Sequence, residues 1–235
     1  MSLKFACFVT GTDTGVGKTL ISAALLHGLA QAGLKTVGMK PLAAGAEMRD
    51  GRLYNDDVAA LEGASSLSVP RELVVPYLLR EPAAPHIAAA LEHTAIDPQR
   101  LLTAYAQIAA QADAVVVEGV GGFRVPLTDD FDTADLAEKL QLDVILVVGL
   151  RLGCLNHALL TAEAIAARGL RLAGWVANQI DPAMPHQQDN IDALRSRLSA
   201  PLLGIVPHMA HASAAVAAQY LDFRWTGVVP AEFSF

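Results

Sequence analysis

The sequence has few cysteines and no long apolar run, and each shortage excludes a class of protein. Its 235 residues include two cysteines, Cys7 and Cys154. Two cysteines cannot build a disulfide framework or a four-cysteine zinc site. No apolar run reaches the roughly 18 residues that a bilayer-spanning helix needs, and the N-terminus enters a glycine-rich motif without a signal-peptide cleavage site. We therefore expect a reduced, cytoplasmic protein with no transmembrane helix.

The chain is also short of positive charge. Lys and Arg total 17 against 24 Asp and Glu, which gives a net charge of −7. Nucleic acids and anionic membranes bind clustered positive charge that neutralises their phosphates. The charge balance therefore argues against both as partners. The seven histidines have no metal-ligand spacing, so we expect no zinc site.

Apolar material is plentiful, with 53% hydrophobic and 17% charged residues, enough for a sizeable core. Continuous apolar runs imply a sheet that is buried on both faces, and their alternation with helical segments predicts a doubly wound fold. The expected strands are Phe5–Thr10, Lys35–Lys40, Ala114–Val117, Val144–Val148, Leu172–Ala177 and Leu202–Val206, and the expected helices are Gly17–Ala32, His157–Arg168 and Asp189–Leu198. We predict one domain over residues 1–235, with an irregular, proline-containing insertion at about 43–98. The tail from His208 onward is weakly patterned.

A glycine-rich loop, GTDTGVGKT at residues 11–19, follows the first expected strand and precedes a helix. This is the sequence context of a phosphate-binding P-loop. Backbone N–H groups and the helix N-terminus attract phosphate, Lys18 is expected to reach the β- and γ-phosphates, and the Thr19 hydroxyl is expected to ligate Mg²⁺. Five residues, not the usual four, separate Gly11 from Gly17. The predicted fold is a P-loop NTPase-type α/β domain, with a mostly parallel sheet flanked by helices.

Two charged residues end neighbouring apolar runs. Lys40 closes the second expected strand and Glu118 closes the third. Ligands of parallel sheets bind beyond the carboxyl ends of the strands, and a terminal acid there resembles the Walker B carboxylate that meets the metal. A solvated lysine and a capping acid are the alternatives. Asp57, in the irregular segment, either completes a Mg²⁺ site or belongs to a solvated turn.

Two further segments follow later strands. Gly153–Asn156 opens a helix whose N–H groups suit a carboxylate or phosphate, and ordinary helix capping by Asn156 is the alternative. Asn178 closes the fifth expected strand, where it either reads a purine edge or merely turns the chain.

Six motifs in this order resemble the dethiobiotin synthetase family. They cover about residues 4–207 and are GTDTGVGKT at 11–19, KPLAAG at 40–45, EPAAPHI at 81–87, VEGVGG at 117–122, LGCLNHALLT at 152–161 and AGWVAN at 173–178. The resemblance implies a Mg²⁺- and ATP-dependent cyclo-ligase of biotin biosynthesis. It would convert 7,8-diaminononanoate and CO2 (or bicarbonate) to dethiobiotin, ADP and phosphate, through a carbamate and a carbamic–phosphoric anhydride.

The resemblance also assigns roles to residues. Lys18 and Lys40 would neutralise charge on the carbamate and the phosphoryl group, and Thr19, Asp57 and Glu118 would hold Mg²⁺. The nucleotide would contact Gly15, Val16, Gly17, Lys18, Thr19, Leu20, Asp57, Glu118, Gly119, Val120, Gly121, Asn178, Gln179, Pro207, His208 and Met209. The substrate would contact Thr14, Lys40, Ala44, Gly153, Cys154, Leu155 and Asn156, the last four of which come from the partner subunit of a homodimer in this family.

The chain departs from the family pattern at three places. Ala44 stands where a serine is common, Gly15 stands where some relatives have an acidic residue, and the pattern fades after Met209. Loss of one serine hydrogen bond costs roughly 0.5–1.5 kcal/mol, which would not abolish activity.

Three other functions use the same kind of P-loop. Dimerising switch ATPases of partition and septum positioning carry a second lysine early in the loop, where this chain has Thr12 and Asp13. An amidoligase would need a glutaminase domain, for which 235 residues leave no room. A small-molecule kinase fits the P-loop alone, so the reaction product distinguishes it from a cyclo-ligase.

Overall fold

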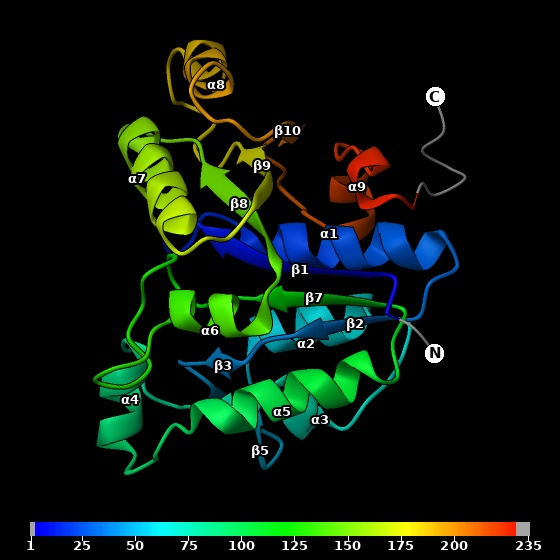
Figure 1. Ribbon diagram of the computed structural model, residues 1–235, viewed down its shortest axis with the longest axis vertical. Coiled ribbons are helices and arrows are strands. Elements are labelled where there is room, and N and C mark those ends of the chain that lie inside the picture. The colour runs from blue at the N-terminus through cyan, green and yellow to red at the C-terminus, as the bar shows by residue number, and fades with distance from the viewer. Residues whose placement is uncertain (1–2, 229–235) are drawn as a thin grey trace.

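A computed structural model describes residues 3–228, and its centre is a six-stranded parallel sheet (Figure 1). The strand order is β10-β9-β8-β1-β7-β2. The strands are β1 (Phe5–Gly11), β2 (Thr36–Met39), β7 (Ala114–Glu118), β8 (Asp143–Gly149), β9 (Leu172–Asn178) and β10 (Leu202–Val206). The chain adds β7 and β2 on one side of β1 and β8 to β10 on the other. The carboxyl end of β1 therefore lies at a topological switch point, where open α/β sheets bind ligands.

Helices cover both faces of the sheet (Figure 1). One face packs against α1 (Lys18–Gln31), α2 (Asp56–Ala64) and α9 (Ala214–Ala218). The other packs against α5 (Pro98–Ala109), α6 (Thr133–Leu140), α7 (Cys154–Ala167) and α8 (Gln187–Arg195). Successive strand residues point to opposite faces: Phe8 belongs to the core under α5 and α6, and Val9 to the core under α1. The apolar runs are continuous because both faces are buried. The doubly wound prediction is confirmed.

Residues 43–98 form small structures beside β2 instead of a purely irregular segment. This part holds a two-stranded parallel pair and an antiparallel hairpin. Its elements are β3 (Leu42–Ala43), β4 (Glu47–Arg49), β5 (Arg52–Tyr54), α2, α3 (Arg71–Val74), β6 (Tyr77–Leu78) and α4 (Pro85–Leu91). Strands β3 and β6 pair across more than 30 residues, and β4 and β5 form a hairpin of three residues a strand, so none of them is long enough to show a periodic pattern.

Helix boundaries differ from the sequence expectations by a few residues. Helix α7 begins at Cys154, three residues before the expected start, because Gly153 adopts φ 95° and serves as its N-cap. Asn156 therefore lies inside the helix, and the alternative that it caps the helix is wrong. The tail, expected to be weakly patterned, contains α9 and a short 3-10 helix, η1 (Arg224–Thr226).

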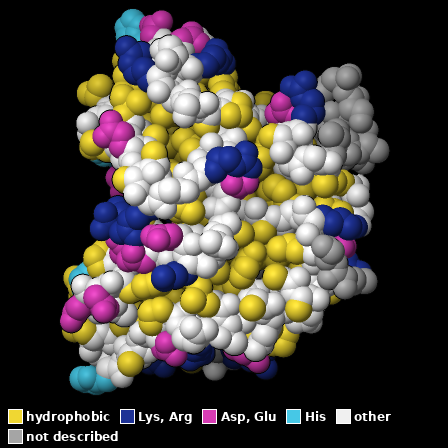
Figure 2. All heavy atoms as spheres, in the orientation of Figure 1, with side chains coloured by type: hydrophobic (Ala, Val, Ile, Leu, Met, Phe, Trp, Pro, Cys, Tyr) yellow, Lys and Arg dark blue, Asp and Glu magenta, His cyan; other side chains and the backbone are white. Residues whose placement is uncertain are grey.

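The helices of the described residues and the face drawn in Figure 2 bear on membranes and nucleic acids as partners. Within residues 3–228 no helix is long and apolar enough to cross a bilayer. On the face drawn in Figure 2, Lys and Arg side chains lie scattered beside Asp and Glu. That face presents mixed charge rather than the single-sign field that recruits a phosphate backbone.

Candidate active site

The P-loop joins β1 to α1 in the geometry expected of a phosphate cradle. Gly15 and Gly17 adopt φ 73° and 91°, a region that side chains with a Cβ rarely occupy. A Cβ at Gly17 would also collide with the Asn178 amide. Lys18 is 7% exposed and its Nζ donates to the carbonyl of Asp13 at 2.9 Å. The loop therefore curls around its own lysine at the N-terminus of α1, where anions bind.

Four side chains from distant parts of the sequence meet beside this loop. The Thr19 hydroxyl lies 2.8 Å from both Asp57 Oδ1 and Glu118 Oε1. Lys40 Nζ lies 2.6 Å from Glu118 Oε1 and 3.0 Å from Asp57 Oδ2. Lys40 also donates to the carbonyl of Gly119 at 3.1 Å. The solvated-lysine alternative for Lys40 is wrong, because its side chain is 3% exposed.

Charge within this cluster shifts the pKa values of its members. Burial, together with the positive charge of Lys40, lowers the pKa of Lys18 to about 8. Burial also opposes the charged form of Lys40, but the Glu118 and Asp57 carboxylates outweigh it and raise the pKa of Lys40. Burial likewise opposes ionisation of Asp57, yet Lys40 and the Thr19 hydroxyl hold the pKa of that carboxyl below its usual value. The cluster thus holds charged Lys40 against two carboxylates.

The same cluster has the oxygen atoms that a hard cation takes as ligands. Thr19, Asp57 and Glu118 offer one hydroxyl and two carboxylates, the oxygen ligands that Mg²⁺ prefers. Glu118 is fully buried, and its Oε2 makes no hydrogen bond to any residue that the structure describes. An ionised oxygen buried without a partner is costly. A cation or a water bound at that oxygen would remove the cost.

A cavity of about 940 Å³ opens over the cluster. Its floor is the P-loop and the strand ends, and its walls come from the 82–85 segment and the loop after β7. The lining residues are Asp13, Thr14, Gly15, Gly17, Lys18, Thr19, Lys40, Ala43, Ala44, Asp57, Pro82, Ala83, Ala84, Pro85, Glu118, Val120, Gly121, Gly122 and Val125. The cavity combines charge at one end with an apolar wall, so it suits a phosphorylated nucleotide beside a partly apolar second substrate.

Curated relatives resolve which P-loop family this geometry belongs to. A protein of Janthinobacterium sp. (strain Marseille) named ATP-dependent dethiobiotin synthetase BioD is 59% identical over 227 residues, covering 95% of this chain and 96% of that protein. A protein of the same name from Aromatoleum aromaticum is 58% identical, covering 92% and 96%. The chain belongs to the dethiobiotin synthetase family. A family model described as an AAA domain also matches residues 6–216.

Solved structures with a similar backbone are only distantly related in sequence, so they inform on the fold of the chain and not on its activity. The septum site-determining protein MinD with Mg-ADP from Pyrococcus horikoshii OT3 aligns with TM-score 0.56 and 17% identity, over 96% of this chain and 89% of that one. A ParA family ATPase from Chlorobium tepidum TLS aligns with TM-score 0.53 and 16% identity, over 93% and 90%. These likenesses confirm the predicted P-loop NTPase-type fold.

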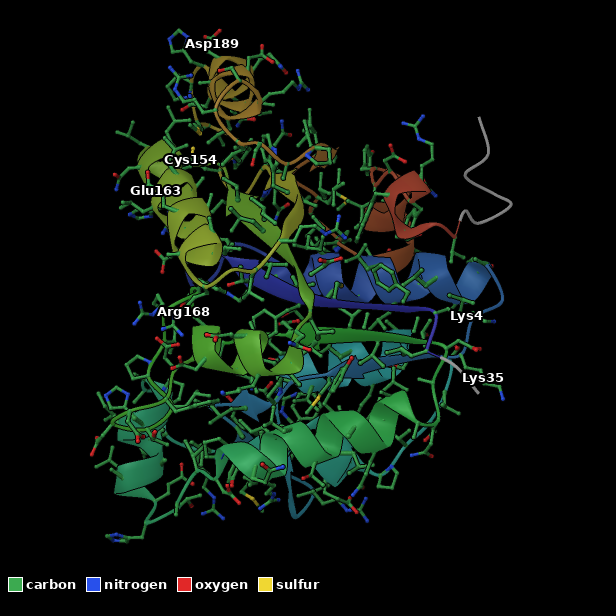
Figure 3. The ribbon with its side chains drawn as sticks, in the orientation of Figure 1. Lys4, Lys35, Cys154, Glu163, Arg168 and Asp189 are labelled. Carbon is green, nitrogen blue, oxygen red and sulfur yellow. The ribbon has the colours of Figure 1, made fainter. Side chains whose placement is uncertain are left out.

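Some of the residues that the family resemblance assigns to the nucleotide or the substrate do not line the cavity. Asn178 is 6% exposed, and its Nδ2 donates to the carbonyl of Val16 at 2.9 Å, so its amide braces the P-loop. Gly153–Asn156 lies in the loop after β8 and the first turn of α7. There, Cys154 packs toward α8 (Figure 3). The other predicted residues that do not line the cavity are Val16, Leu20, Gly119, Gln179, Pro207, His208 and Met209.

The sequence reasoning missed two parts of the site. The apolar wall of Pro82 to Pro85 lies inside the quoted motif at 81–87, so the signal was present but was given no role. Asp13 also lines the cavity. Its carboxylate accepts from the Thr14 N–H at 2.7 Å and pairs with Arg151 from the loop before α7. The hydrogen bond from the Thr14 N–H, and to a smaller extent the charge of Arg151, hold the pKa of Asp13 below its usual value.

Proposed function

We propose that this chain closes the ureido ring of dethiobiotin from 7,8-diaminononanoate and CO2, with ATP converted to ADP and phosphate. The enzyme is thus an ATP-dependent cyclo-ligase. The observation that carries the proposal is the pairing of buried Lys40 with Glu118 and Asp57 beside Lys18, at the charged end of a cavity with an apolar wall. Relatives above 50% identity carry the name of this activity.

The reaction proceeds in three proposed steps. One amine of the substrate attacks CO2 and loses a proton, which gives a carbamate. A carbamate oxygen attacks the γ-phosphorus of ATP, and ADP leaves with the electrons of the broken P–O bond. The second amine then attacks the carbonyl carbon of the carbamic–phosphoric anhydride and loses a proton, and phosphate leaves as the ring closes. No step requires a nucleophile from the protein, so positioning and charge stabilisation are the main tasks of the site.

The two lysines supply positive charge where negative charge gathers. Lys18 would bind the β- and γ-phosphate oxygens from the P-loop. Lys40 approaches from β2 and would stabilise charge on the carbamate and on the phosphoryl group in transfer. Both residues are buried, with 7% of Lys18 and 2% of Lys40 exposed. Charge acts more strongly there than in water.

Thr19, Asp57 and Glu118 would hold Mg²⁺. When bound, the ion would neutralise negative charge on the phosphates. The orphan oxygen of Glu118 supports this assignment, since an oxygen ligand set with one unpaired buried carboxylate oxygen suits a hard cation.

The remaining part of the substrate site would come from a second copy of the chain. Gly153–Asn156 does not line the cavity of its own chain. Leu152, just before this segment, is 96% exposed, and Leu160, further along α7, is 56% exposed. Exposed apolar side chains beside an unused binding segment suit an isologous homodimer interface. The segment would then bind the substrate carboxylate in the partner's cavity.

The first experiment measures ADP release by the purified protein with and without diaminononanoate and bicarbonate. We expect hydrolysis that needs both, with one ADP per dethiobiotin formed. Lys40→Ala should eliminate turnover, whereas Lys35→Ala, at the opposite end of β2 (Figure 3), should not. Hydrolysis independent of both substrates would support a switch ATPase, and a phosphorylated acceptor without CO2 dependence would support a kinase.

A mixing experiment tests the shared site. Lys40→Ala and Asn156→Asp should each be inactive, because the first removes the cavity lysine and the second sets a charge against the substrate carboxylate. A refolded equal mixture of the two should recover about a quarter of wild-type activity, since half the dimers are mixed and each mixed dimer has one intact site. An inactive mixture that still forms dimers would contradict the shared site.

A further inference from the structure

The loop after β7 lines the cavity but is bonded mainly at its two ends. At its start, the Gly119 N–H donates to the β1 backbone at 2.9 Å, and its carbonyl accepts from Lys40. Within residues 3–228, the N–H groups of Val120, Gly121 and Gly122 donate to no protein acceptor. All three residues line the cavity. Because these cavity-lining residues leave their N–H groups without an acceptor in the part of the chain that the structure describes, each can donate a hydrogen bond to a bound ligand.

One buried side chain holds the other end of this loop. The Thr133 hydroxyl donates to the carbonyl of Phe123 at 2.6 Å and accepts from the Val125 N–H at 3.1 Å. The Thr133 N–H donates to the carbonyl of Val125 at 3.0 Å. Thr133 is 2% exposed and does not line the cavity, whereas Val125 does. A single residue thus makes three hydrogen bonds to the loop backbone from behind, two of them through its side chain.

Thr133 is itself held by the rest of the fold. It is the first residue of α6, which Asp132 caps in a capping box with Asp135. Arg168, at the end of α7, pairs with both carboxylates, and Arg124 of the loop pairs with Asp132. Figure 3 places Arg168 between the end of α7 and α6. The position of Thr133 is therefore set by two helices, and Thr133 transmits it to the loop.

We propose that Thr133 is a positioning residue for phosphoryl transfer. Its hydroxyl fixes residues 123–125, and through them it presents the N–H groups of Val120, Gly121 and Gly122 to the group in transfer. Fixed donors accelerate a reaction most where charge develops, since they need no reorganisation at that moment. The proposal rests on the proposed function. It gives the loop after β7 a role at the transferring group beside those of Lys18 and Lys40.

The test compares two variants that differ in one hydroxyl. Thr133→Val keeps the shape of the side chain and removes both hydrogen bonds, whereas Thr133→Ser keeps them. Thr36→Val is the matched control: Thr36 is fully buried, its hydroxyl accepts from the Ser66 N–H at 3.0 Å, and it begins β2 at the end of the sheet away from the cavity. The readouts are kcat, ADP affinity by calorimetry, AMP-PNP affinity with Mg²⁺, and amide hydrogen exchange over residues 123–125.

We expect Thr133→Val to lower kcat about tenfold with ADP affinity unchanged, and Thr133→Ser to stay within about twofold of wild type. Exchange at residues 123–125 should accelerate in Thr133→Val, and AMP-PNP should bind more weakly. Thr36→Val should lose stability and keep kcat. A wild-type kcat in Thr133→Val, an equal loss in Thr133→Ser, or an ADP affinity that falls as far as kcat would overturn the proposal.

Failure of the proposed function is distinguishable from failure of this proposal. Wild-type protein that forms no dethiobiotin would overturn the proposed function. Exchange and AMP-PNP binding do not require that reaction, so they would still decide the role of Thr133. Unchanged exchange and unchanged AMP-PNP affinity in Thr133→Val would then overturn the positioning role by themselves.

Discussion

Lys40 Nζ and Glu118 Oε1 lie 2.6 Å apart, and their side chains are 3% and 0% exposed. Each charge is buried away from water, and each compensates the other. Removal of one partner from such a pair costs roughly 3–5 kcal/mol, since the other charge stays buried without compensation. Loss of either partner alone should therefore lower stability, apart from its effect on the proposed chemistry.

Lys40→Met should consequently lower both activity and stability. We expect dethiobiotin formation to disappear and the free energy of unfolding, measured in urea, to fall by about 3 kcal/mol. Adding Glu118→Gln should recover part of the stability and none of the activity, because the uncompensated charge is gone but the catalytic groups are not restored. A Lys40→Met variant as stable as wild type would contradict this expectation, because it would show that buried Glu118 needs no positive partner.

Gly15 and Gly17 have similar backbone angles but different neighbours, so their alanine variants should differ. A Cβ at Gly15 meets nothing within 4 Å, whereas one at Gly17 collides with the Asn178 amide. Gly15→Ala should cost about 1 kcal/mol of backbone strain. Gly17→Ala should also disturb the Asn178 brace and raise KM for ATP severalfold more. Equal kinetic effects in the two variants would mean that backbone angle alone determines the loop.

Ala44→Ser restores the residue that the family resemblance expects at this position. Ala44 lines the cavity near Lys40 and Asp57. One added hydrogen bond should lower KM for diaminononanoate about two- to twelvefold, which corresponds to roughly 0.5–1.5 kcal/mol, with KM for ATP unchanged. Steady-state kinetics with each substrate varied in turn would measure this. A change in KM for ATP alone would assign Ala44 to the nucleotide side of the cavity.

Asp135 should make stability depend on pH in the acid range. Burial opposes its charged form, but the Asp132 N–H and Arg168 outweigh this and hold the pKa of Asp135 below its usual value. Because the folded pKa is depressed, the stabilisation is complete above the unfolded pKa of about 4 and is lost as pH falls through the folded value. Asp135→Asn should cost about 1 kcal/mol at pH 7.

Thermal unfolding from pH 7 to pH 3 tests this dependence. The difference between wild type and Asp135→Asn should stay constant down to about pH 5 and shrink below about pH 4. Asp129→Asn, at an exposed position nearby, should follow wild type throughout. A difference between Asp135→Asn and wild type that stays constant to pH 3 would assign the loss to geometry instead of charge.

The strands and the P-loop could be predicted because their signals are local. An apolar run and a glycine-rich turn occupy adjacent residues, and strand ends in a parallel sheet share one edge. This reasoning located Lys40 and Glu118 at the site from their places after two strands. Asp57 needed the family resemblance, since its segment lacks periodicity, and the structure then brought it within 3.0 Å of Lys40.

The parts that sequence reasoning missed depend on contacts between distant residues. Pro82 to Pro85 lines the cavity just after β6, which pairs with β3 over two residues, a pairing without a local pattern. Thr133 begins an ordinary amphipathic helix, and nothing in its neighbours reveals that its hydroxyl reaches the backbone of Phe123 and Val125. Such roles follow from tertiary packing, which composition and spacing do not encode.

The placement of residues 43–98 on the β2 side of β1 has a consequence for how such enzymes diversify. Ala43, Ala44 and the 82–85 wall come from one continuous stretch, while β8, β9 and β10 lie across the P-loop. The stretch enters and leaves the sheet between β2 and β7, so its length and side chains can change without altering the strands around the P-loop. Apart from Asp57, which this stretch places 3.0 Å from Lys40 at the proposed metal site, its cavity-facing side chains can therefore change while the P-loop stays the same.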